Sequence, residues 1–244
     1  MISRLGLIAL MYCCLSSAQA EIIYDQSRNR SIPIEVSYPV QKTSCQPQQP
    51  CSVAFLSAGY GVPHTHYQFL TKQLIELGYL VIAIGHELAG DPALSVTGDL
   101  FATRSENWHR GATTLNFLRN ELQPRFSHYD FNNLLLIGHS NGGDISAWLG
   151  NEGKPYIKSI ITLDHRRVPL PRSASIKVLS IRASDFPADK GVLPSEREMS
   201  RDGSCVITIP KAKHNDMSDQ GPQWLKSRIN SVVKLFLQSQ SCPN

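Results

Sequence analysis

Apolar runs alternate along the chain with longer segments in which apolar residues recur at helical spacing. The runs are rich in Val, Ile and Leu, and several are continuous, which is typical of strands buried on both faces of a parallel sheet. They predict strands at 32–38, 53–57, 79–84, 134–137, 157–163, 177–181 and 206–209. Helices are predicted between them, at 66–77, 107–122, 140–149 and 224–237. Strands that alternate with helices indicate an open, mostly parallel α/β sheet with right-handed crossovers.

The segment 85–106 shows no clear period and follows the predicted strand 79–84. Long loops of this kind often carry functional residues. A plain surface loop explains the same pattern, and both interpretations stay open. We find no linker or internal repeat that divides the chain, so the pattern predicts a single domain.

The start of the chain has the three parts of a secretory signal peptide in order. Arg4 precedes an apolar run that ends at Leu15, and the motif Ala18-Gln19-Ala20 supplies a cleavage site. The run is shorter than the ~20 apolar residues that a membrane helix needs. We expect export to the periplasm or the medium, with 1–20 as signal peptide, 21–244 as the mature domain and no transmembrane segment in it. A buried N-terminal helix is the alternative interpretation.

Six cysteines are present, and two of them fall inside the predicted signal peptide. Four remain, namely Cys45, Cys51, Cys205 and Cys242. An even number in an exported protein favours disulfides. We expect one bond between Cys45 and Cys51, across a loop rich in Pro and Gln, and one between Cys205 and Cys242, which would tie the last helix to a late strand. A four-cysteine metal site is the alternative, although the paired C-x-x-C spacing of such sites is missing.

The formal net charge is +4, from 24 basic and 20 acidic residues. The basic residues are spread along the chain rather than gathered in a block, so the sequence does not indicate a nucleic-acid partner. We find no phosphate-binding loop, haem motif or dinucleotide fingerprint, and we expect no cofactor. The oligomeric state leaves no readable sign in the sequence.

A G-x-S-x-G motif follows the predicted strand 134–137 and opens the next helix, in the sequence GHSNGG at 138–143. In this strand–turn–helix setting a serine is exposed above the carboxyl ends of the strands. Gly138 and Gly142 remove side-chain bulk where strand and helix crowd together. The N-terminus of the helix helps to stabilise a developing oxyanion. We therefore expect Ser140 to be a nucleophile; an ordinary glycine-rich turn or an inactive hydrolase scaffold is the alternative.

A serine hydroxyl needs a base to take its proton, and in this arrangement the histidine comes late in the chain. His214 follows the predicted strand 206–209 after a short loop, and we expect it to be the general base. Asp164 and Asp185 each follow a strand, and either one is a candidate for the acid that holds the histidine tautomer and stabilises the imidazolium. Asp189 is a weaker third candidate.

An oxyanion hole needs two backbone N–H groups. We expect one from Asn141, directly after the nucleophile, and the other from Tyr60, which lies between two glycines after the strand 53–57. A glycine turn without this role is the alternative. His64 and His66 lie two apart in a loop, but no third ligand has a suitable spacing, and we expect no metal site.

These motifs resemble those of α/β hydrolases related to platelet-activating-factor acetylhydrolase and, more distantly, to chlorophyllase and bacterial polyester hydrolases. The resemblance covers most of the mature chain, on the segments 53–61, 79–87, 138–143, 161–164 and 206–214. It implies the α/β-hydrolase fold, with a mostly parallel central sheet and helices on both faces. The short distance between the acid motifs and His214 leaves no room for a large cap domain.

The likeness to the acetylhydrolases implies that Asp164 is the acid, and we expect Asp164 on that ground. The likeness to the polyester hydrolases implies Asp185, which is the alternative. The oxyanion loop departs from the family, because it begins with Ala58-Gly59 where His-Gly is common. Lipoprotein or phospholipid specificity is therefore not carried over. The sequence predicts a secreted serine hydrolase that cleaves short-acyl or lipid-like carboxylic esters through an acyl-enzyme. An amide or peptide hydrolase with the same residues, or a non-catalytic binding protein on this scaffold, is the alternative.

Overall fold

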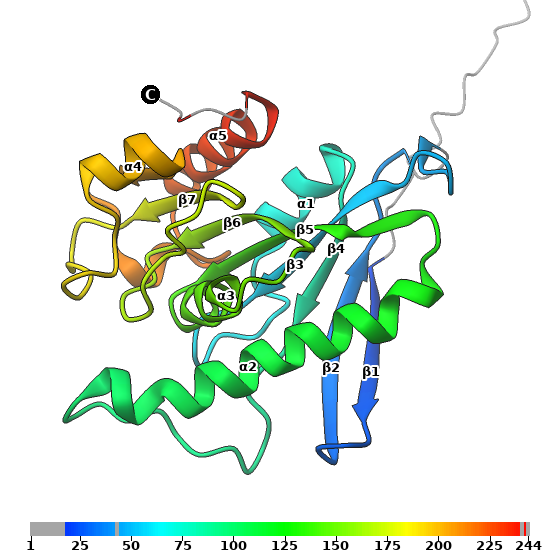
Figure 1. Cartoon of the computed structure of the whole chain (residues 1–244), viewed down its shortest axis with the longest axis horizontal. Helices are drawn as coiled ribbons and strands as arrows, with labels where there is room; N and C mark the ends of the chain where they lie inside the picture. Colours follow the sequence, from blue (N-terminus) through cyan, green and yellow to red (C-terminus); the bar gives the residue numbers. More distant parts are fainter. Residues whose placement is uncertain (1–17, 42–43, 240–241, 243–244) are drawn as a thin grey trace, which may run out of the picture.

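The computed structural model describes residues 18–41, 44–239 and 242. Its centre is an eight-stranded sheet with the strand order β1-β2-β4-β3-β5-β6-β7-β8 (Figure 1). The strands are β1 (Gln19–Asp25), β2 (Arg30–Ser37), β3 (Cys51–Ser57), β4 (Leu80–Ile84), β5 (Tyr129–His139), β6 (Ile157–Leu163), β7 (Lys177–Arg182) and β8 (Cys205–Thr208). The strands from β4 to β8 pair in parallel, and β1 and β2 join this sheet in antiparallel fashion. The predicted α/β class with a mostly parallel sheet is confirmed.

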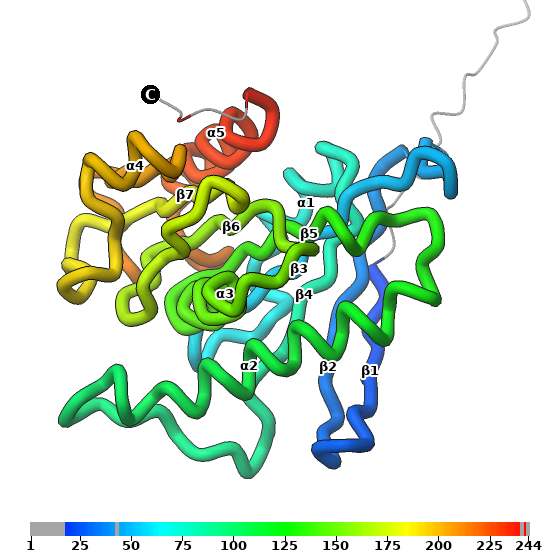
Figure 2. Tube along the Cα trace, in the orientation of Figure 1, coloured from blue at the N-terminus to red at the C-terminus, as the bar shows by residue number. Residues whose placement is uncertain are grey.

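Helices cover both faces of the sheet. They are α1 (Gln68–Glu76), α2 (Leu100–Leu122), α3 (Asn141–Asn151), α4 (Glu196–Asp202) and α5 (Gln223–Ser239), with short 3-10 helices η2 (Gln123–Arg125) and η3 (His214–Asp216). Successive residues of a strand point to opposite faces, so Phe55 belongs to the same core cluster as Trp108 of α2, whereas Leu56 belongs to the cluster that contains Ile229 of α5. Figures 1 and 2 show α2 and α3 in front of the sheet; α1 and α5 cover the other face. The core therefore lies in two layers, one on each side of the strands.

Every strand predicted from the sequence is present, and β1 and α4 are additional. β1 was not predicted because its first two residues lie in the predicted signal peptide and, of the rest, only Ile23 and Asp25 are buried. α4 buries no side chain, so no apolar period marks it. Its start is fixed by a capping box between Ser195 and Glu198.

The segment 85–106 is only partly a loop, which corrects the predicted start of α2 at residue 107. α2 begins at Leu100. The Asp99 side chain caps it by accepting hydrogen bonds from the N–H groups of Phe101 and Ala102, each at 3.1 Å. The apolar period is weak in these first turns because they lie at the surface.

Most of the predicted signal peptide, residues 1–17, lies outside the described residues. β1 pairs with β2 from Gln19 onward. Cleavage before Glu21 would therefore remove two residues from the start of this edge strand and leave the rest paired. Among the described helices, none is both long and apolar enough to cross a membrane.

Two disulfides are present in the structure. Cys45 and Cys51 are joined across six positions, and Cys205 and Cys242 across 37 positions. The second bond connects the first residue of β8 to the chain that follows α5, and so fixes the C-terminal helix against the last strand of the sheet.

Candidate active site

Ser140 occupies the sharp turn between β5 and α3. Its φ of 50° and ψ of −120° lie outside the regions that non-glycine residues prefer. The turn is crowded: a Cβ atom on Gly142 would lie 2.2 Å from the Ser57 carbonyl oxygen. One on Gly138 would lie 2.2 Å from the carbonyl oxygen of Gly142. The two glycines of the motif are therefore required by the close approach of strand and helix.

The imidazole of His214 lies between Ser140 and Asp164. Its Nε2 is 2.9 Å from the Ser140 Oγ, and its Nδ1 is 2.5 Å from Oδ2 of Asp164. A carboxylate accepts only, so Nδ1 carries the proton and Nε2 is free to accept from the serine hydroxyl. The three residues come from the ends of β5 and β6 and from η3, all beyond the carboxyl edge of the parallel sheet.

Asp164 is fully buried directly after β6, with a φ of 47°. Its Oδ1 accepts a hydrogen bond from the Ala183 N–H at 3.0 Å and lies 2.8 Å from Nη2 of Arg182. Nη2 of Arg166 is 3.2 Å from its Oδ2. Burial by itself raises the pKa of the carboxyl, but the hydrogen bond from His214, the Arg182 charge and the other donors outweigh burial and lower the pKa of Asp164.

The other two candidate aspartates do not contact the imidazole of His214. Asp185 accepts the backbone N–H of His214 at 3.0 and 3.1 Å, and so holds the loop rather than the ring. Asp189 forms an ion pair with Arg167 at 2.5 Å. The geometry thus places Asp164, and not Asp185 or Asp189, next to the predicted base.

Of the two predicted oxyanion donors, Tyr60 lines the same cleft as Ser140, and Asn141 begins α3 directly after it. No backbone or side-chain acceptor in the described chain takes the N–H of Tyr60 or of Asn141. The neighbouring Gly59 N–H is already occupied, because it donates to the Tyr67 hydroxyl at 3.0 Å. Tyr60 and Asn141 therefore keep the free donors that an oxyanion needs.

The Asn141 side chain is held on three sides. Its Oδ1 accepts a hydrogen bond from the Trp108 indole N–H at 2.8 Å, and its Nδ2 donates to Asn107 at 2.9 Å and to Glu87 at 3.2 Å. Burial raises the pKa of Glu87, although its bond to Asn141 acts in the opposite direction. These contacts fix the first residue of α3, and with it the direction of its N–H.

A cleft of about 270 Å³ opens beside Ser140 and His214. Its walls are the loop 59–63, His139 and residues 215, 218 and 220, and they are more polar than apolar. A cleft of this size is smaller than the range of about 300–1,000 Å³ typical for drug-sized ligands. The site is thus suited to a small group at the reacting carbon.

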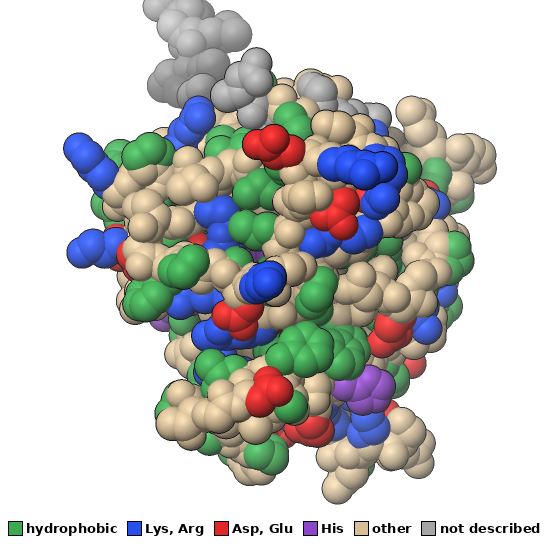
Figure 3. All heavy atoms as spheres, turned by 60° about the vertical axis from the view of Figure 1, so that its left-hand side comes forward, with side chains coloured by type: hydrophobic (Ala, Val, Ile, Leu, Met, Phe, Trp, Pro, Cys, Tyr) green, Lys and Arg blue, Asp and Glu red, His purple; other side chains and the backbone are tan. Residues whose placement is uncertain are grey.

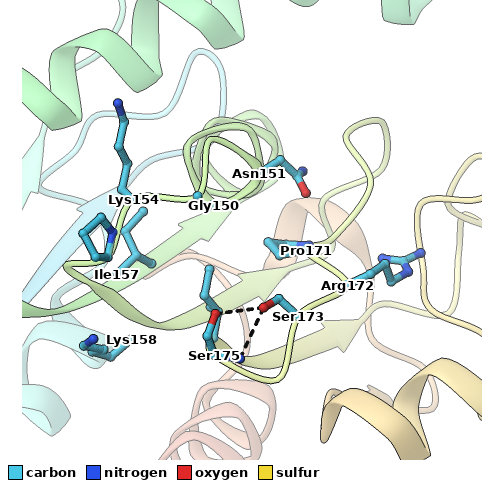
Figure 4. Close-up of a pocket in the computed structure, with 12 residues that line it drawn as sticks. Gly150, Asn151, Lys154, Ile157, Lys158, Pro171, Arg172, Ser173 and Ser175 are labelled. Atoms are coloured by element: carbon cyan, nitrogen blue, oxygen red, sulfur yellow. Dashed lines mark hydrogen bonds between the residues drawn. The ribbon is translucent and has the colours of Figure 1, made fainter.

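A larger cavity, of about 490 Å³, lies at the other end of the sheet, near the start of β6 and before β7 (Figure 4). The side chain of Arg172 extends away from Ser173 and Ser175 in this view. Arg172 is 3.3 Å from Glu198, and Lys154 pairs with a neighbouring glutamate. No residue of the cleft beside Ser140 lines this cavity.

Three further histidines, His64, His66 and His86, follow strands or lie in loops at the carboxyl edge of the sheet. His86 is buried and its Nε2 is 2.9 Å from the Ser57 hydroxyl; burial, and nearby arginines, lower its pKa to about 3. His64 and His66 do not line the cleft beside Ser140. Within the described ranges, no group of three His, Cys, Asp or Glu side chains could hold a metal ion. On the face in Figure 3, basic side chains are interspersed with acidic and apolar ones.

Several residues at the site were not predicted from the sequence. Tyr67, Trp108 and Arg182 belong to no motif, and Glu87 ends the segment 79–87 of the family resemblance without a predicted role. Each meets its partner only through the fold. The position of Glu87 just after β4 offers one signal, since side chains beyond the carboxyl ends of parallel strands gather at the same edge.

Comparison with known proteins bears on the fold. No protein-family model and no curated protein matches the sequence. Esterase 2 of Thermogutta terrifontis, phosphorylated by paraoxon, is similar with a TM-score of 0.64 and 11% identity, over 93% of this chain and 96% of that chain. A putative dienelactone hydrolase from Klebsiella pneumoniae has a TM-score of 0.63 and 16% identity, over 92% and 99%.

The ferulic acid esterase of Streptomyces cinnamoneus has a TM-score of 0.63 and 17% identity, over 93% of this chain and 84% of that chain. All three likenesses extend over nearly the whole described chain at low identity. Together with the sheet order, they assign this protein to the α/β-hydrolase fold.

Proposed function

We propose that this protein is a serine hydrolase that cleaves carboxylic esters, with Ser140 as nucleophile, His214 as general base and Asp164 as the orienting acid. The observation that carries the proposal is the continuous contact from Ser140 Oγ to His214 at 2.9 Å and from His214 to Asp164 at 2.5 Å. Such a chain recurs on unrelated folds and is recognised by its geometry.

In the proposed mechanism the Ser140 oxygen attacks the ester carbonyl while Nε2 of His214 takes its proton. The tetrahedral oxyanion receives hydrogen bonds from the N–H groups of Tyr60 and Asn141. His214 then protonates the leaving alcohol, and an acyl-enzyme remains on Ser140. Water, deprotonated by the same histidine, attacks this ester; the Ser140 oxygen then leaves, takes the proton back from His214, and the acid is released. Asp164 stays ionised throughout, because its arginine and histidine partners lower its pKa.

The substrate class follows from the size and lining of the cleft. A polar cleft of about 270 Å³ favours short acyl groups over long apolar chains. The esterase names of two of the similar structures favour an ester over an amide. On the sequence motifs alone, we also propose that this protein is related to platelet-activating-factor acetylhydrolase and, more distantly, to chlorophyllase and polyester hydrolases.

Export is a second part of the proposal. The signal-peptide pattern at 1–20 supports it, and two disulfides are compatible with an oxidising compartment. N-terminal sequencing of protein produced with its natural start tests this point. We expect Glu21 as the first residue; an unprocessed chain would contradict export by this route.

Turnover of p-nitrophenyl acetate and butyrate tests the activity. We expect kcat for these esters to fall at least about 10³-fold in Ser140→Ala. The matching p-nitroanilides separate ester from amide hydrolysis. Turnover of anilides but not of esters would replace the esterase proposal by an amidase, and no turnover above the Ser140→Ala control would overturn both.

A further inference from the structure

We infer that Tyr67 and His139 are positioning residues, which hold the oxyanion loop and the loop of the general base at a fixed separation. The inference rests on the proposed function of the site. It is carried by three hydrogen bonds, between four residues, that we call the Tyr67–His139 chain. Neither side chain needs to touch the substrate for this role.

The Tyr67–His139 chain runs from one loop to the other without a gap. The Gly59 N–H donates to the Tyr67 hydroxyl oxygen at 3.0 Å. The same hydroxyl is 2.8 Å from Nδ1 of His139, and Nε2 of His139 is 3.0 Å from the backbone carbonyl oxygen of His214. Gly59 precedes the proposed oxyanion donor Tyr60, and His214 is the proposed base.

The directions of these bonds are fixed by the groups at the two ends. A carbonyl oxygen only accepts, so Nε2 of His139 must carry a proton. In a neutral imidazole Nδ1 then accepts, and the Tyr67 hydroxyl donates to it while its oxygen accepts from Gly59. Burial is the main cause that lowers the pKa of His139 to about 3, so the ring stays neutral and keeps this tautomer at neutral pH.

The surroundings give the chain little freedom. Tyr67 is 1% exposed and His139 is 4% exposed. A Cβ atom on Gly59 would lie 2.8 Å from Nδ1 of His139, so the oxyanion loop rests directly on the imidazole ring. The rings of His139 and His214 have centroids 5.0 Å apart. A displacement of His139 is therefore transmitted to both loops.

The expected consequence is an effect on kcat rather than on KM. The Tyr60 N–H stabilises charge that develops only in the transition state, and small errors in its position cost rate without weakening substrate binding. A smaller folded fraction would also lower the apparent kcat at an unchanged KM, so kcat is calculated per folded protein at a temperature below the Tm of every variant. A fall in kcat that remains after this correction distinguishes positioning from a general loss of stability.

The test compares substitutions that break the chain at different links. Tyr67→Phe removes the hydroxyl. His139→Gln can still donate to the His214 carbonyl but loses the link to Tyr67, whereas His139→Asn can still accept from Tyr67 but loses the link to His214. Tyr156→Phe is the matched control, because this buried tyrosine donates to Asn116 at 2.6 Å, before the start of β6 at the other end of the sheet.

Initial rates with p-nitrophenyl acetate give kcat and KM, and thermal unfolding gives the Tm of each variant. We expect Tyr67→Phe and each His139 substitution to lower kcat about 10-fold or more with KM within about twofold. Tyr156→Phe keeps the wild-type kcat at a similar loss of Tm. Because Tyr67→Phe and His139→Gln remove the same link, the double variant should be no slower than the slower single variant.

The inference is overturned if kcat of folded Tyr67→Phe equals that of wild type, or if Tyr156→Phe slows the reaction equally. Additive losses in the double variant would also overturn it, because the two residues would then act separately. If Tyr67→Phe does not fold, the same criteria apply to the two His139 variants. Failure of the wild-type protein to hydrolyse any ester would overturn the proposed function itself, which is a different and separable result.

Discussion

Asp164 is a buried carboxylate with an unusually positive environment. Arg182 contacts one of its oxygens, and Arg166 and His214 contact the other. The sequence predicted Ser140 and His214 from a motif and from chain order. For the acid, strand position alone allowed Asp164 or Asp185, and only the family resemblance favoured Asp164. Both follow a strand at the same edge of the sheet. Only the path of the chain after each strand decides which one reaches the imidazole and which one reaches the backbone.

Asp164→Asn tests this assignment. The amide cannot stabilise the imidazolium and favours the wrong histidine tautomer, so we expect kcat to fall about 10⁴-fold. Asp185→Asn is the matched control, because Asp185 contacts the backbone N–H of His214 rather than its ring. We expect it to lower kcat by less than about 10-fold. A reversed order in steady-state rates would assign the acid to Asp185.

At the scale of elements, the turn between β5 and α3 depends on glycines that the motif predicted. Other features left no pattern in the sequence. α4 buries nothing, β1 overlaps the predicted signal peptide, and the bond from Trp108 to Asn141 joins residues 33 positions apart. Apolar periodicity reports burial, so it predicts buried strands well and exposed or polar features poorly.

Gly142→Ala should damage the turn. Its Cβ would lie 2.2 Å and 2.4 Å from the carbonyl oxygens of Ser57 and Ala58, which are backbone atoms and cannot rotate away. We expect the free energy of unfolding to fall by about 3 kcal/mol, with loss of esterase activity. Gly150→Ala is the comparison in the same helix, because its Cβ would lie 2.4 Å from Cδ1 of Ile160 and 2.8 Å from Cγ of Pro171, which are side-chain rather than backbone atoms. We expect a smaller loss there, of about 1 kcal/mol, and equal losses in chemical denaturation would contradict the account.

The two disulfides should differ in their effect on stability. In the chain-entropy account, a bond that closes a loop of 37 positions contributes about 4 kcal/mol, and one that closes six positions about 2.4 kcal/mol. We expect the pair Cys205→Ser and Cys242→Ser to lower the free energy of unfolding more than the pair Cys45→Ser and Cys51→Ser. Urea titration of both double variants measures the order, and a larger effect from the short loop would refute this account.

For the whole molecule, buried histidines connect stability to pH. Burial is the main cause that lowers the pKa values of His86, His139 and His165 to about 3. The unfolded chain binds these protons near the ordinary histidine pKa of about 6.5, whereas the folded chain does not. Their contribution to stability is thus complete above about pH 6.5 and is lost as the pH falls toward 3. Asp144, whose pKa burial raises to about 6, and Glu87 act in the opposite direction over part of this range.

We expect the free energy of unfolding to decrease between pH 7 and pH 5. In this range the three histidines take up more protons on unfolding than the two acids release. Each unbalanced proton corresponds to about 1.4 kcal/mol per pH unit. His165→Leu should reduce the slope of the free energy of unfolding against pH by the equivalent of about one proton. The His165 ring is fully buried and neither of its nitrogens makes a well-formed hydrogen bond in the described chain, although the nearby Val168 backbone raises its pKa somewhat against the effect of burial. Denaturant titrations at several pH values test this, and an unchanged slope in the variant would show that His165 does not contribute.

The fold class of the whole molecule follows from its alternating apolar runs, because buried parallel strands carry a strong and local signal. The chemistry of the site is less local. Its serine and histidine lie 74 positions apart, and the networks around them depend on contacts between distant segments. The central claim, an activated serine, therefore needs a direct measurement on the protein.

That measurement is labelling of the mature protein by a fluorophosphonate, with the modified residue located by peptide mass spectrometry. The account predicts fast modification of wild type at Ser140 and none in Ser140→Ala or His214→Ala, because the hydroxyl reacts only when a base takes its proton. A folded wild-type protein that stays unlabelled, or that is labelled at another serine, would contradict the account.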